Sequence, residues 1–232
     1  MYTNLQPINK VADKNKAIKE VKDFSYTKEQ INAPITVAEF YEACKDYPIL
    51  FAKDANDSWM ATAMLGYKEK ENLFIDENGI WEKQRYIPAH IRRYPFIYVN
   101  NSENDQLTLA VEGEYKSEAK EDESRKLFDK EGNNSEFLNS VLGFLNQFHA
   151  DAQATAQFIK QLEDWELLEE KVANITTKDN KTYTINGFYV VNEEKLKHLS
   201  KKKKEDICNK NAMPLITAHL ISLSNIQKLG MR

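Results

Sequence analysis

The chain has 232 residues, of which 41% are hydrophobic and 29% charged, a composition typical of a folded globular protein and not of a disordered or collagen-like chain. Lysine and arginine number 32 and aspartate and glutamate 36, so no overall positive field favours nucleic acid or an anionic membrane. We therefore expect no nucleic-acid partner. No stretch approaches about 18 consecutive apolar residues, and no membrane span is expected.

The N-terminal segment is polar and rich in lysine. It lacks the apolar stretch of a secretion signal peptide, which predicts a cytoplasmic protein, although export by a signal-independent route stays open. We predict that residues 1–30 form an arm and that residues 31–232 form a single domain. Cys44 and Cys208 show no metal-ligand spacing and are predicted to be free thiols in a reducing compartment.

The first predicted elements after the arm are a helix and a hairpin. Residues 37–44 are predicted to form a short helix, with Thr36 as its N-cap and Glu39 as the capping-box partner of Thr36. Apolar runs at residues 49–53 and 60–67 are separated by a polar turn. This pattern predicts two antiparallel strands.

The middle of the chain alternates turn signals with short apolar runs. The sequence DENG at residues 76–79 predicts a tight turn, because Asn-Gly favours positive φ angles. A helical turn is expected at residues 88–94, where a proline stands at the start. Residues 96–99 and 107–111 are predicted to pair as strands. The charged residues 115–134 are predicted to form a loop or linker.

The clearest helix follows. Apolar residues recur at steps of three or four over residues 135–168, which predicts a long amphipathic helix with Ser135 as its N-cap. A hairpin is expected over residues 171–191, and then three short helices at residues 193–199, 201–209 and 212–229. The predicted fold class is α+β, with small antiparallel sheets, a long amphipathic helix and a helical C-terminus.

Residues 71–96 contain the best candidate binding surface. Prolines make this segment rigid, and arginines lie close to aromatic residues in it. An arginine beside an aromatic ring can hold a carboxylate or phosphate with two hydrogen bonds. Alternatively, it pairs with a nearby carboxylate and packs its stem on the ring. The predicted ligand-binding residues are Asn72, Trp81, Tyr86, Arg92 and Arg93.

Signals for catalysis and for cofactors are weak. The four histidines form no HxH or HExxH pattern, so no metal site is expected. There is no P-loop and no dinucleotide fingerprint, and no cofactor is predicted. The alternative function is an enzyme acting on a peptide or a small anionic metabolite, with His90 or His149 as the acid–base group. Such an enzyme would bring a histidine and a carboxylate together near Arg92 or Arg93.

Several short motifs in a fixed order resemble the SapC family of proteins. They are YPILF at residues 47–51, ENLF at 71–74, YIP at 86–88 and RRYPF at 92–96, and the resemblance extends over residues 36–229. That family is associated with bacterial surface-layer gene clusters. The resemblance implies an accessory or binding protein of surface-layer or envelope biogenesis, with a protein or peptide partner of that system or a small anionic ligand. It implies no catalytic residues.

Overall fold

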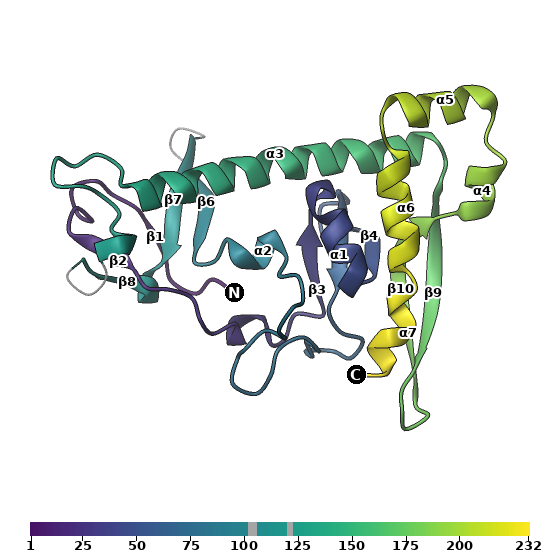
Figure 1. The fold of residues 1–232 in the computed structure, drawn as a ribbon, viewed down its shortest axis with the longest axis horizontal. Helices are drawn as coiled ribbons and strands as arrows, with labels where there is room; N and C mark the ends of the chain where they lie inside the picture. Colours follow the sequence, from purple (N-terminus) through teal and green to yellow (C-terminus); the bar gives the residue numbers. More distant parts are fainter. Residues whose placement is uncertain (102–105, 120–122) are drawn as a thin grey trace.

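The computed structural model describes residues 1–101, 106–119 and 123–232 (Figure 1). Its largest sheet has five strands in the order β3-β5-β4-β10-β9, all pairs antiparallel. Their bounds are Asn32–Ile35 (β3), Trp59–Met64 (β5), Ile49–Lys53 (β4), Thr182–Val191 (β10) and Leu168–Thr176 (β9). The predicted hairpins at residues 49–67 and 171–191 are therefore confirmed.

A second, three-stranded sheet has the order β1-β7-β6, from Leu5–Pro7 (β1), Gln106–Glu112 (β7) and Phe96–Asn101 (β6). The pairing of β6 with β7 was predicted, and most of the turn between them lies outside the described residues. A two-stranded sheet joins β2 (Lys16–Ile18) to β8 (Lys116–Glu118).

One long helix packs against both the three-stranded sheet and the five-stranded sheet. Helix α3 (Glu136–Asp164) begins where predicted, because the Ser135 hydroxyl accepts a hydrogen bond from the Leu138 N–H at 3.0 Å. In Figure 1 it runs along most of the length of the molecule, over the three-stranded sheet at one end and the five-stranded sheet at the other. Its first half contributes Leu138 and Leu145 to one core, and its last turns contribute Phe158 and Leu162 to another.

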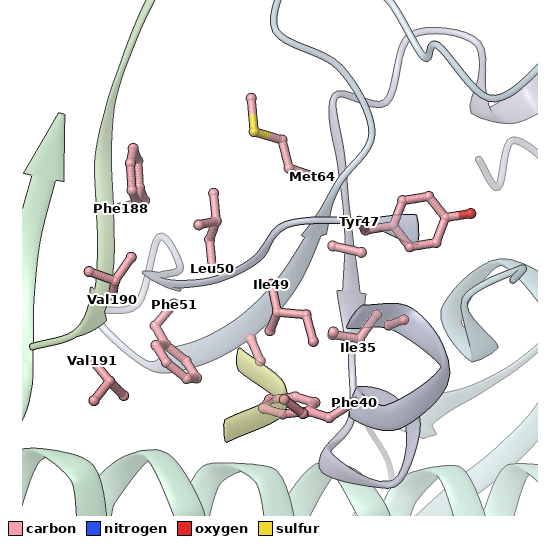
Figure 2. Close-up of a cluster of buried hydrophobic side chains, with 14 of the residues drawn as sticks. Ile35, Phe40, Tyr47, Ile49, Leu50, Phe51, Met64, Phe188, Val190 and Val191 are labelled. Carbon is pink, nitrogen blue, oxygen red and sulfur yellow. The ribbon is translucent and has the colours of Figure 1, made fainter. Parts of the chain in front are cut away.

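The main core lies between the five-stranded sheet and the helices α1 (Phe40–Asp46), α3 and α6 (Met213–Ser222). Neighbouring strand residues point to opposite faces, as a pleated strand requires. Figure 2 shows Ile49 and Phe51 on the side of α3, and Leu50 on the other side with Met64 and Phe188. The α+β class, with a long helix and a helical C-terminus, is confirmed.

Two local predictions need correction. Residues 115–134, predicted to be a loop or linker, contain β8 and also bury Leu127 and Phe128 in the smaller core. The C-terminal part forms four helices, because the last predicted helix divides into α6 and α7 (Asn225–Gly230). The hydroxyls of Ser222 and Ser224 donate to backbone carbonyls three residues earlier, and such bonds compete with helix continuation. The other two helices are α4 (Glu193–Lys197) and α5 (Lys201–Asn209).

The N-terminal segment packs on the smaller core. Ala17 and Ile18 of β2 are fully buried, and β1 pairs with β7. The buried carboxylate of Glu112 accepts hydrogen bonds from the backbone N–H groups of Thr3 and Asn4, each at 2.8 Å. Across the described residues, none of the helices combines the length and the apolar character that crossing a bilayer requires.

Candidate functional site

The predicted helical turn at residues 88–94 is the short helix α2 (Ala89–Arg92), with Pro88 at its N-cap. A short segment with a cis peptide bond between Tyr94 and Pro95 follows and leads into β6. Helix α2 lies near the middle of the molecule beneath α3 (Figure 1). This placement directs Arg92 and Arg93 toward the side chains of α3.

Arg92 is exposed but held on several sides. Its Nε–H donates to the carbonyl of Ile87 at 2.9 Å, and Nη2 donates to the hydroxyl of Tyr86 at 3.0 Å. The guanidinium carbon lies 5.5 Å from the ring centroids of both Tyr86 and Phe144, within the range of a cation–π contact. The side chain therefore has one preferred position.

The buried carboxylate of Glu39 accepts a hydrogen bond from the Tyr86 hydroxyl and so fixes the position of that side chain. Glu39 accepts four hydrogen bonds: from the N–H and hydroxyl of Thr36 at 2.8 and 3.0 Å, from Tyr86 Oη at 3.0 Å and from the Ala89 N–H at 2.7 Å. Burial and the Glu39 charge raise the pKa of Tyr86 to about 12, so its hydroxyl stays protonated at neutral pH. The capping box predicted from Thr36 and Glu39 is confirmed, and its role in placing Tyr86 and Arg92 was not predicted.

Arg93 is half-buried, with its guanidinium carbon 5.2 Å from the ring centroid of Phe148. Burial lowers the pKa of this guanidinium, and contact with Tyr2 opposes that shift. The Tyr2 hydroxyl donates to the carbonyl of Phe96 at 2.8 Å. The Nε of Arg93 is buried with no hydrogen-bond acceptor among the described residues.

A third arginine, Arg125, joins this site and was not predicted. It ends a short 3-10 helix (Glu123–Arg125) in the segment predicted to be a loop. Its Nε–H donates to the carbonyl of Ile18 at 2.7 Å, and its guanidinium carbon lies 4.5 Å from the ring centroid of Phe137. Its position two residues before the apolar pair Leu127 and Phe128 was the one sequence signal that could have located it.

The three arginines line one cavity of about 180 Å³ against α3, which we call the arginine pocket. Its other lining residues are Tyr94, Pro95, Phe96, Phe137, Ser140, Val141, Phe144 and Leu145. Within the described part of the chain, this lining contains no acidic residue and no histidine. None of its arginines forms an ion pair with a described carboxylate. A second cavity of about 150 Å³ lies on the other side of Arg92, beside Glu39, Gln147 and Asp151.

Two predicted site residues lie elsewhere. Asn72 is buried, donates to Thr27 at 3.3 Å and accepts from the Phe74 N–H at 2.9 Å. Trp81 is buried with its ring near those of Phe24 and Phe74. The structure thus groups Tyr86, Arg92 and Arg93 and places Asn72 and Trp81 in the interior.

The two histidines considered for acid–base chemistry are not in the arginine pocket. His90 is half-buried and lines a different cavity of about 250 Å³, where burial, with the charge of Arg93, lowers its pKa to about 4. His149 is exposed on α3, with Nε2 at 3.2 Å from Nε2 of Gln153. Among the residues that the structure describes, no three histidine, cysteine or acidic side chains gather as metal ligands would.

Comparison with known proteins gives one result. Neither the curated proteins nor the solved structures include a match to this chain. The family model for SapC matches residues 8–229, which include α2, α3 and all three arginines of the pocket. The match begins earlier than the motifs that suggested the resemblance, since it includes β2. The chain belongs to the SapC family.

Proposed function

We propose that this protein is an accessory binding protein of bacterial surface-layer or envelope biogenesis that holds an anionic group in the arginine pocket. That group is a carboxylate or a phosphate, carried by a protein or peptide partner or by a small ligand. The observation that carries the proposal is the convergence of Arg92, Arg93 and Arg125 on one cavity without a carboxylate from the described residues. The link to the envelope rests on family membership.

Three like charges around one cavity repel one another, and the repulsion grows as the groups leave water. Arg93 is half-buried, so it cannot be fully screened by solvent. An anion bound in the pocket would reduce this repulsion and could form charge-assisted hydrogen bonds with the arginines that line it. The arrangement therefore supports a binding role.

The enzyme alternative has less support. It requires a histidine and a carboxylate that converge near Arg92 or Arg93. The described lining of the arginine pocket has neither, while His90 faces another cavity and His149 faces solvent. Ligand binding is the function that this geometry favours.

Anion binding can be tested by isothermal titration of the full chain with phosphate, sulfate and benzoate at fixed ionic strength. We expect at least one anion to bind, and Arg92→Gln to weaken that binding at least tenfold. Arg85→Gln is the matched control, because Arg85 is already paired with Asp46 at 2.9 Å and Glu82 at 3.0 Å. If none of the anions binds the unmodified protein, the proposal fails.

The proposal also places the protein in the cytoplasm, as expected from the sequence. Cell fractionation followed by detection of the protein tests this location. We expect it in the cytosolic fraction; recovery in a cell-surface extract would instead make it an exported component of the surface layer.

A further inference from the structure

We propose that the arginine pocket prefers a phosphate monoester on a small molecule over a carboxylate, and that Arg125 supplies the third cation that sets this preference. This inference rests on the proposed function and specifies the ligand class for the same site.

The three arginines that line the pocket carry more positive charge than one carboxylate can balance. Arg92, Arg93 and Arg125 contribute three positive charges, and no acidic side chain of the described residues lines the pocket. A carboxylate brings one negative charge, whereas a phosphate monoester carries about −1.5 to −2 at pH 7. The larger negative charge of the phosphate cancels more of the repulsion among the arginines than a carboxylate does. The phosphate dianion should therefore bind more tightly.

The free donors also fit a phosphate. A guanidinium has five N–H donors. Arg92 uses donors on Nε and Nη2 for Ile87 and Tyr86, and Arg125 uses Nε for Ile18, which leaves donors on both residues unused by the described chain. Nε of Arg93 is buried without an acceptor. The arginines that line the pocket therefore offer N–H donors for the three terminal oxygens of a phosphate monoester, while a carboxylate offers only two oxygens.

Helix α3 holds the three guanidiniums in place before a ligand arrives. Arg125, Arg92 and Arg93 lie 4.5, 5.5 and 5.2 Å from the rings of Phe137, Phe144 and Phe148, respectively. These phenylalanines are spaced by seven and four residues, so they lie on one face of the helix. Fixing the donors in advance reduces the entropy lost on binding. The cavity of about 180 Å³ has room for a phosphate and a few further atoms.

The test compares phenyl phosphate with benzoate, which share a ring and differ in the anionic group. Isothermal titration of the full chain at pH 7.5 and fixed ionic strength should show phenyl phosphate binding at least tenfold more tightly. Arg125→Gln should reduce this preference to less than threefold. Arg85→Gln, with the same change in charge outside the pocket, should keep it.

A second variant tests the site without removing an arginine. Ser140 is exposed on α3 and lines the pocket, so Ser140→Glu places a carboxylate among the guanidiniums. We expect a higher melting temperature, because repulsion is relieved, and at least a tenfold loss of phenyl phosphate binding. Gln157→Glu adds the same charge to an exposed position farther along α3 and should leave binding unchanged.

The outcomes separate the two proposals. Equal affinity for benzoate and phenyl phosphate, both lost in Ser140→Glu, overturns the phosphate preference and leaves anion binding in place. A preference for phosphate that neither Arg125→Gln nor Ser140→Glu changes overturns the inference, because the site would lie elsewhere. Absence of binding by any of the anions, phosphate and sulfate included, would remove the proposed function together with the inference.

Discussion

The imidazole of His219 joins two strands of the main sheet by standing between Ile49 and Val191. Nδ1 donates to the carbonyl of Ile49 at 2.9 Å, and Nε2 accepts the N–H of Val191 at 3.0 Å. Strands β4 and β10 pair at Phe51 and Tyr189, so the antiparallel register places Ile49 opposite Val191. The side chain thus replaces a backbone bond at the point where the two strands separate, and these bonds require the neutral imidazole.

The first prediction concerns acid pH. Burial lowers the pKa of His219 from 6.5 to about 4. The unfolded chain therefore takes up a proton before the folded chain does, and stability present above pH 6.5 is lost as the pH falls toward 4. The shift corresponds to roughly 3 kcal/mol of unfolding free energy. Urea denaturation at a series of pH values from 7.5 to 4.5 measures it.

A control is needed because the pKa of His90 is also lowered to about 4 and acts in the same direction. His90→Gln and His219→Gln should each remove part of the pH dependence. His149→Gln, at an exposed position, is the control for the loss of a histidine side chain. Equal slopes for the His219 variant and the unmodified protein would show that His219 does not titrate in this range.

The second prediction concerns the same side chain at neutral pH. His219→Ala removes the bridge and leaves the carbonyl of Ile49 and the N–H of Val191 buried without partners. An unsatisfied buried polar group costs about 1–3 kcal/mol, and a cavity adds to this, so we expect a loss of about 3–5 kcal/mol. Denaturation at pH 7.5 measures the loss, with His149→Ala as the exposed control. A loss below about 1 kcal/mol would mean that water or a backbone shift repairs the sheet.

The third prediction concerns the buried carboxylate of Glu39. Glu39→Gln replaces one acceptor oxygen with an NH₂ group, which faces donors from Thr36, Tyr86 or Ala89. We expect a loss of about 2–4 kcal/mol, because hydrogen bonds to a charged group are strong and a mismatched donor is left buried. Thermal and urea unfolding measure this loss.

Glu42→Gln provides the comparison for Glu39. Glu42 lies three residues away and forms an exposed pair with Lys45 at 2.7 Å, which should contribute little to stability because solvent screens it. Similar losses of stability in the two variants would contradict the role of Glu39 as a buried acceptor of four hydrogen bonds.

The fourth prediction concerns glycine. Gly143 lies inside α3, and an added Cβ would meet no atom within 4 Å. Gly143→Ala should therefore stabilise the protein by about 1 kcal/mol, the difference in helix propensity between the two residues. Gly66→Ala should strongly destabilise it, because its Cβ would lie 1.9 Å from the carbonyl oxygen of Glu71. A rise in melting temperature for the first variant and a fall for the second checks both expectations.

The sequence by itself determined the local structure. The apolar spacing and Ser135 predicted the start of α3, and Thr36 with Glu39 predicted the start of the first helical segment. The hairpins also followed from alternation and turn residues. These features depend on neighbours within a few positions, where residue preferences act directly. Short motifs in a fixed order, among them YPILF at residues 47–51 and RRYPF at 92–96, suggested the family, which the match over residues 8–229 established.

Only the tertiary structure decided which residues far apart in the sequence lie together. Arg125 joins Arg92 and Arg93 only because β2 and β8 pair and Leu127 docks in the smaller core. Asn72 and Trp81 looked like surface residues in a motif, yet hydrogen bonding to Thr27 and packing on Phe24 and Phe74 place them inside.

His219 shows the same limit of sequence reasoning. Its two partners lie 170 and 28 residues away along the chain, so no local pattern could name them. Periodicity places a side chain on a face of its own helix or strand, and the packing of distant elements then decides what that face meets.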